Sequence, residues 1–299
     1  MGQLMSKEEQ LKEFVKRFKQ CPDVKVNRSI VMFCSTSSSE TLQQHLNNRT
    51  QKEYPIADWM KQLAEKLANL CSKPELAGLG ALAIAIFIDV ISATSSSEAT
   101  MEALRSVFAE EKASEVWDQI DECLKRCMIN INNRAELVSD IKRIECQLSA
   151  AVTKLKNSMV RDGHMSHQAL KAWVNGAAFH IQMLIHLVRL GGIQTCDPVV
   201  GLLSAYLRDL DLLFEKHKEV VKKKCKLREL MLEEGLAPCF VSEEDEWDFI
   251  SYYTPFSEYF EAYYEEHYNS QKNEIRKYFR KVRDDLPELV SQVGHLSVC

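Results

Sequence analysis

The chain has 299 residues, of which 45% are hydrophobic and 27% charged, and its formal net charge is −5. This composition excludes a disordered, collagen-like or low-complexity chain. So small a net charge also gives no indication of a dedicated nucleic-acid-binding protein. Ten cysteines occur without a secretory signal, which is typical of reduced thiols rather than of a disulfide framework. We therefore expect a cytoplasmic protein.

The N-terminus has the pattern of an N-myristoylation signal, with Gly2 after the initiator and Ser6 at the sixth position. Ser6 and Glu9 also have the spacing of a capping box, so the same residues predict a helix over about 6–20. The two interpretations are compatible. We expect Gly2 to carry a myristoyl chain.

A single myristoyl chain binds membranes only marginally, so stable attachment needs a second signal. The predicted first helix supplies a modest basic patch, in which five basic residues outnumber three acidic ones. Each basic residue close to an anionic membrane contributes about 1 kcal/mol. We expect this patch to assist binding to lipids on the cytoplasmic face of a membrane. Its residues are Lys7, Lys12, Lys16, Arg17 and Lys19.

The rest of the chain is predicted to be almost wholly helical. Only residues 24–33 have some strand character. Asp162-Gly163 and Gly191-Gly192 are helix-stop signals, and Asp197-Pro198 is a start signal with Asp197 as the N-cap. The expected helices cover residues 41–50, 55–70, 74 onward, 97–127, 133–160, 166–190 and 197–234.

Two of these helices have the apolar spacing of a coiled coil. In residues 133–160 the steps alternate between four and three, through Leu137, Ile141, Ile144, Leu148, Ala151 and Leu155. A similar seam in residues 197–234 includes His217, Leu227 and Met231. These patterns predict an all-α fold, an elongated antiparallel helical bundle of long amphipathic helices with little or no β-structure.

We expect three regions along the chain. Residues 1–54 would form an N-terminal, membrane-proximal helix and linker, and residues 55–236 the core of the helical bundle. Residues 237–299 would form an acidic, aromatic helical segment that packs on the bundle. In that segment a helical stripe predicts packing, whereas acidic residues beside tyrosines suggest a docking segment that is open to phosphorylation. The stripe consists of Phe256, Phe260, Tyr263, His267, Ile275, Phe279 and Val282.

Two apolar segments allow either of two interpretations. Residues 76–88 carry no charge, and residues 172–188 carry none apart from His180 and His186. Both are shorter than the ~20 residues that span a bilayer, so they are either buried central helices or helices that insert into a membrane after a conformational change. Insertion would use Leu79, Leu82, Ile84, Ile86, Phe87 and Ile88.

One stretch near the C-terminus resembles a known family. The run from Tyr263 to Val290, with its paired tyrosines, acidic residues and Arg/Lys-rich second half, is similar to the last helix of the rapunzel and cephalotoxin-like helical proteins. The resemblance covers under a tenth of the chain. It implies an all-helical, non-enzymatic protein that interacts with membranes.

Motifs for catalysis and metal binding are not convincing. Gly78 and Gly80 superficially match a dinucleotide-binding fingerprint, but that motif must follow a strand, and here a helix is expected. Two cysteines, Cys123 and Cys127, and the two histidines His164 and His167 do not have zinc-finger spacing. We therefore expect no catalytic residue, no cofactor and no bound metal.

Two hypotheses about function remain. The first is a non-catalytic, N-myristoylated helical protein that associates with the cytoplasmic face of a membrane as a peripheral protein. It would bind membrane lipids or a protein partner, and not nucleic acid. The alternative is a membrane-inserting, pore-forming-like helical protein. The sequence leaves the oligomeric state open.

Overall fold

The computed structural model describes residues 6–19, 21–27, 30–31, 111–130, 133–233 and 235–291. The expected acylation site Gly2 and the expected helices 41–50, 55–70 and 74 onward lie outside these residues. So do all the candidate membrane-inserting residues, Leu79, Leu82, Ile84, Ile86, Phe87 and Ile88.

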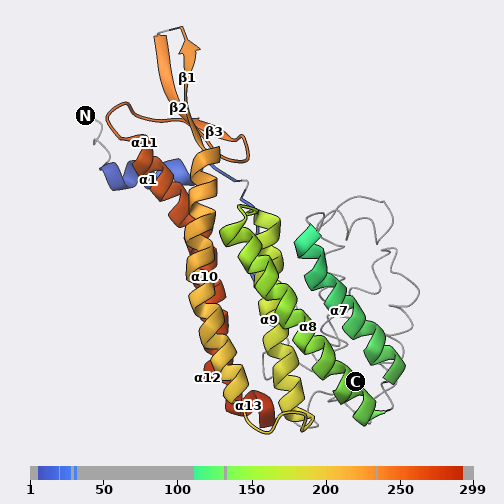
Figure 1. The fold of residues 1–299 in the computed structure, drawn as a ribbon. Helices are drawn as coiled ribbons and strands as arrows, with labels where there is room; N and C mark the ends of the chain where they lie inside the picture. Colours follow the sequence, from blue (N-terminus) through green and yellow to red (C-terminus); the bar gives the residue numbers. More distant parts are fainter. Residues whose placement is uncertain are drawn as a thin grey trace, which may run out of the picture.

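The described residues are mostly helical, with one small sheet (Figure 1). The helices are α1 (Lys7–Val15), α7 (Glu111–Asn130), α8 (Arg134–Arg161), α9 (His167–Arg189), α10 (Asp197–Lys224), α11 (Phe256–Tyr264), α12 (Ser270–Asp284) and α13 (Leu286–Ser291). A π-helix, η1 (Glu265–Asn269), joins α11 to α12. The strands are β1 (Lys226–Leu232), β2 (Gly235–Val241) and β3 (Trp247–Phe249), in that order and antiparallel.

The long helices lie side by side, with α9 between α8 and α10 (Figure 1). The predicted seam of α8 is confirmed, because all six of its residues from Leu137 to Leu155 are buried. Nearly every residue of α9 is buried as well, so this helix is the centre of the core. At Gly176 of α9 an added Cβ would lie only 2.6 Å from Val116 of α7 and 3.1 Å from Val152 of α8. The glycine therefore allows three helices to approach closely.

Local signals place several helix ends near the predicted positions, although α1 ends at Val15 and not near residue 20. Ser6 forms the capping box of α1 with Glu9. Gly163 (φ 79°) follows the end of α8, and Gly191 (φ 69°) follows the end of α9, in the left-handed conformation that glycine adopts at low cost. The prediction for Asp197 is wrong by one position, since Asp197 is the first residue of α10 and Cys196 precedes it without a side-chain cap.

The sheet is the main departure from the predicted all-α fold. The helix expected over residues 197–234 ends at Lys224, because Cys225 is extended (φ −66°, ψ 141°). The chain then pairs as β1 with β2, from Lys226 opposite Val241 to Leu232 opposite Gly235. Leu227 and Met231, which were assigned to a buried seam, are exposed on this hairpin.

The strand character predicted for residues 24–33 is also wrong for the part that the structure describes. Residues 21–27 are irregular, and Ile30 and Val31 are helical. Val24, Val26 and Ile30 are nevertheless buried. Their side chains therefore contribute to the core without a sheet ladder.

An aromatic cluster holds α1, the sheet and α11 together. Phe240 of β2 lies 5.3 Å from Phe14 and 5.5 Å from Phe18, both in the N-terminal segment, and 5.2 Å from Phe256, as ring-centroid distances. The predicted stripe of the C-terminal segment is buried at Phe260, Tyr263, Ile275, Phe279 and Val282, and half-buried at Phe256 and His267. The stripe is thus buried as predicted, but the part of this segment before α11, which was expected to be helical, contains strand β3 and most of β2.

Candidate functional site

Large apolar side chains are exposed at the end of the molecule where the sheet projects beyond the helices (Figure 1). We call this group the sheet surface. Met231 is 78% exposed and Leu236, opposite it, 53%. Several exposed apolar side chains at one end of a protein make that end a candidate interaction surface. The sheet surface consists of Leu227, Met231, Leu232, Leu236, Trp247, Phe249, Tyr252 and Tyr253.

The strand register divides these side chains between the two faces of the sheet. Successive residues of a strand point to opposite faces, so Leu227, Met231 and their partner Leu236 share one face. Trp247 and Phe249 share the other face and form an edge-to-face pair 5.3 Å apart. The Tyr252 hydroxyl donates a hydrogen bond to the carbonyl of Leu236 (2.9 Å), which holds the turn before α11 against the hairpin.

Basic side chains adjoin the sheet surface. They come from the last turn of α10 and from β1, and all are exposed. Within the part of the chain that the structure describes, none of them forms an ion pair, although the Lys222 ammonium lies 5.5 Å from the Phe260 ring centroid. These residues are Lys222, Lys223, Lys224, Lys226 and Arg228.

The basic residues predicted in the first helix are placed differently. Lys7 pairs with Glu258 of α11, Arg17 with Asp248 of β3 (2.8 Å) and Lys16 with Glu13 (2.7 Å). Lys12 and Lys19 are exposed, and the backbone N–H of Lys19 donates to Glu246. The apolar face of α1 is buried at Phe14 and Val15. This helix is therefore docked on the C-terminal segment, with part of its positive charge compensated by neighbouring carboxylates.

A buried histidine pair lies beneath the sheet, and its hydrogen bonds fix the positions of its protons. The Tyr264 hydroxyl donates to the carbonyl of Phe214 (2.9 Å), so the contact with His217 Nδ1 (3.0 Å) must use a proton on Nδ1. His217 Nε2 is then an acceptor, and His167 Nδ1 donates to it (2.9 Å). The free His167 Nε2 lies 3.8 Å from Glu244. Burial lowers the pKa of His217 to about 3 and lowers that of His167 as well.

A second group of hydrogen bonds centres on Glu243, in the turn after β2. Its carboxylate accepts one hydrogen bond from the Tyr268 hydroxyl and one from the Cys225 thiol (3.3 Å). The Tyr268 ring stacks on His167, with centroids 5.6 Å apart. Burial and the charge of Glu243 raise the pKa values of Tyr268 and Cys225. We call the residues Glu243, Tyr268, Cys225, His167, His217 and Tyr264 the buried polar network.

The buried polar network does not have the properties of a nucleophilic catalytic site. Reactive cysteines have a lowered pKa, next to a histidine or a helix N-terminus. Here the pKa of Cys225 is raised, and its hydrogen-bond partner is a carboxylate. Burial also raises the pKa of the nearby Cys21 thiol to about 12. Among the described residues, moreover, no three His, Cys, Asp or Glu side chains are grouped so that they could hold a metal ion.

The two histidines predicted on the apolar helix, His180 and His186, are buried in the core. His180 is buried between the Tyr206 hydroxyl (2.7 Å) and Glu145 (2.6 Å), and its hydrogen bond lowers the pKa of Glu145. His186 is fully buried, which lowers its pKa well below the ordinary value. Within the described ranges, none of the helices combines the length and hydropathy that crossing a membrane requires.

Comparison of the chain with protein-family models, with curated proteins and with solved structures finds no match. The resemblance of residues 263–290 to the rapunzel and cephalotoxin-like proteins therefore stays a prediction.

Proposed function

We propose that this chain is a non-catalytic, N-myristoylated helical protein that binds the anionic cytoplasmic face of a membrane as a peripheral protein. Attachment would combine a myristoyl chain on Gly2 with the sheet surface. The observation that carries the proposal is the projecting hairpin, on which exposed apolar side chains such as Met231 adjoin five basic residues without ion pairs in the described structure. The long helices would serve as an antiparallel bundle that supports this end and offers surface to a protein partner.

The chemistry of the sheet surface suits a lipid interface. Trp and Tyr side chains are enriched at the boundary between membrane and water, and Trp247, Tyr252 and Tyr253 are exposed here. The adjoining lysines and arginine would each contribute about 1 kcal/mol near anionic lipids. A membrane therefore matches both the apolar and the basic parts of this end.

The position of α1 supports this proposal, since a short chain from Lys7 to Gly2 would keep the expected acylation site near the same end. In Figure 1, α1 lies beside α11 at the base of the projecting sheet. Gly2 is five residues from Lys7, so an extended chain keeps it within about 18 Å of that residue. A myristoyl chain on Gly2 and the sheet surface could then contact one bilayer together, as two weak signals that are sufficient when combined.

No observation in the described residues favours the membrane-inserting alternative. Of the two segments it would require, residues 76–88 lie outside the description. The other is part of α9, which packs against α7, α8 and α10 as the central helix. Its extraction would expose the main core of the long helices.

The test is sedimentation of the unacylated protein with vesicles of phosphatidylcholine and phosphatidylserine. Met231 and Leu232 are 78% and 46% exposed, and burying such side chains fully is worth about 1.5–3 kcal/mol each. The double variant Met231→Ser/Leu232→Ser should therefore lose at least about 2 kcal/mol, or roughly 30-fold in affinity. Ile129→Ser is the control, because Ile129 is 63% exposed on α7, away from the sheet.

Two outcomes would contradict the proposal. One is equal binding of the double variant and the control. The other is binding that does not weaken when phosphatidylserine is removed or salt is raised, since the basic residues act through screened charge. The acylation part is tested separately by intact-mass measurement after expression in a eukaryotic cell. Wild type should carry one myristoyl chain, and Gly2→Ala should carry none and leave the membrane fraction.

A further inference from the structure

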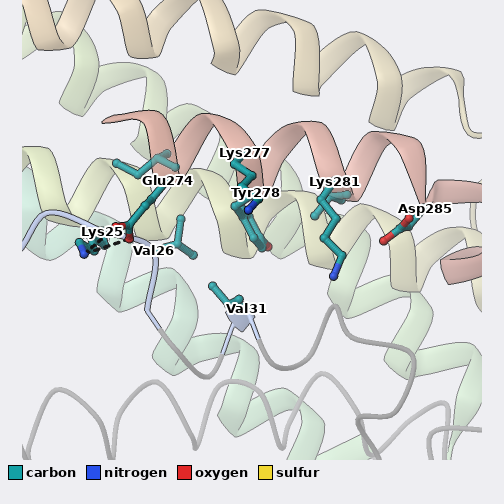
Figure 2. A pocket seen from close by; sticks show the side chains of 10 residues that line it. Lys25, Val26, Val31, Glu274, Lys277, Tyr278, Lys281 and Asp285 are labelled. Carbon is teal, nitrogen blue, oxygen red and sulfur yellow. Dashed lines mark hydrogen bonds and ion pairs between the residues drawn. The ribbon is translucent and has the colours of Figure 1, made fainter. Parts of the chain in front are cut away.

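A pocket of about 260 Å³ lies between α12 and the irregular segment around Val26, and none of its lining residues belongs to the sheet surface (Figure 2). Its wall is apolar where Val26, Val31, Ile275 and Val282 line it. Tyr278 closes one side, and its hydroxyl accepts a hydrogen bond from Gln182 of α9 (3.3 Å). The pocket therefore has an apolar interior that is anchored on the central helix.

The rim of this pocket carries three lysines and two carboxylates. Lys25 and Glu274 form an ion pair at one end (2.9 Å), which Figure 2 shows as a dashed line. Lys277 and Lys281 also line the pocket, and Lys281 extends from α12 at the other end (Figure 2). Neither lysine forms an ion pair with another residue in the described ranges, although Asp285 is one turn beyond Lys281.

The spacing of the two lysines places two like charges next to each other, with Asp285 beyond Lys281 and with Glu274 already paired to Lys25. Residues four apart lie next to each other on a helix surface, and two like charges in these positions destabilise a helix by about 0.2–0.5 kcal/mol. Lys277 and Lys281 are such a pair. An anion bound between them would turn this repulsion into attraction on both sides.

From these features we infer that the pocket binds a small amphiphile with an anionic head group. The apolar wall would hold the tail, and Lys277 and Lys281 would hold a carboxylate or a phosphate. A cavity of 150 Å³ holds one benzene ring, so the volume suits a tail of about ten carbon atoms. An acyl chain linked to Gly2 by an amide has no anionic head, so this inference is independent of the proposed function.

The inference is tested by isothermal titration of the unacylated protein with decanoate and decyl phosphate, below their micellar concentrations. If both ligands bind, the site accepts anionic head groups in general. If only one binds, the preferred head group is the carboxylate or the phosphate of that ligand. Decanol and decyltrimethylammonium have the same tail without the negative charge. They should bind at least tenfold more weakly.

Variants of exposed residues locate the site without disturbing the fold. Lys277→Gln and Lys281→Gln should each weaken decanoate binding about three- to fivefold, as expected for solvated charges. Arg280→Gln removes the same charge from the exposed surface of α12 outside the pocket, and it should leave affinity unchanged. Val31→Asp should abolish binding by placing a carboxylate in the wall.

Three results would overturn the inference. These are absence of binding by both anionic ligands, equal affinity for decanol and decanoate, and equal effects of Lys281→Gln and Arg280→Gln. Vesicle binding by the sheet surface does not enter any of them. Failure here therefore leaves the proposed function untouched, and the reverse also holds.

Discussion

Acidification should destabilise this protein through the buried histidine pair. His217 contacts His167 and the rings of Phe214, Tyr264 and Tyr268. The positive charge of Lys224 also acts on it. Its Nε2 accepts a hydrogen bond from His167 Nδ1, so a proton on Nε2 would break that hydrogen bond. Burial first, and then His167 and Lys224, lower the pKa of His217 to about 3.

The size of the effect follows from the difference between the folded and unfolded chains. An unfolded histidine has a pKa near 6.5, so below that pH the unfolded chain binds a proton that folded His217 does not. Stability therefore falls as the pH decreases from about 6.5 toward 3 and is unaffected by this group above 7. At pH 5 the loss is about 2 kcal/mol, and it changes little if the folded pKa is one unit higher.

The assay is urea unfolding of wild type and His217→Phe at pH 7 and pH 5. The variant loses hydrogen bonds at both pH values, so the quantity to compare is the difference in unfolding free energy between them. The loss of unfolding free energy between pH 7 and pH 5 should be about 2 kcal/mol smaller in His217→Phe than in wild type. His164→Phe is the control, because His164 is exposed in the turn before α9. An unchanged difference in His217→Phe would refute the reasoning.

Two further predictions concern the core and the thiols. Phe240→Ala should lower the unfolding free energy by about 3–5 kcal/mol. Phe249→Ala, at a site 39% exposed on the next strand, should lower it far less. Equal losses of stability in thermal melts would contradict the role given to Phe240 in the aromatic cluster. In peptide-resolved labelling with a thiol reagent, exposed Cys146 should react in the native protein, and buried Cys225 and Cys239 only after unfolding; equal rates would show that the thiols are not protected.

The helices that depend on local signals were predictable from the sequence. The expected ranges 133–160 and 166–190 match α8 and α9 to within one residue at each end. Heptad spacing fixes the buried face of α8, and glycines at positive φ stop both helices. Each of these signals lies within a few residues of the structure that it determines, so no knowledge of the partner is needed.

The sheet was not predicted because the spacing of its apolar residues fits both a helix and a strand. Leu227 and Met231 are four residues apart, and this distance puts two residues on the same face of a helix and also on the same face of a strand. The deciding fact is the pairing of β1 with β2, which the periodicity of residues 226–232 alone does not contain. Gly235, next to the turn at φ 125°, was the available hairpin signal.

The buried polar network could not be predicted from the sequence for a related reason. The sequence placed His217 in an apolar seam, and His217, Tyr264 and Tyr268 of this network are indeed buried. Their polar partners are far away in the chain, since Glu243 is 25 residues from Tyr268 and His167 is 50 from His217. Spacing patterns detect which side of an element is buried, but not which buried polar groups meet.

The position of this network connects it to the sheet surface. Cys225 immediately precedes β1 and Glu243 follows β2 by two residues, so their hydrogen bond closes the base of the hairpin. Tyr268 ties the same carboxylate to η1. The Tyr268 ring stacks on His167, and His167 donates a hydrogen bond to His217, so protonation of His217 in acid would disturb the same junction. Acid should therefore loosen the attachment of the sheet before it loosens the apolar packing of α8 against α9.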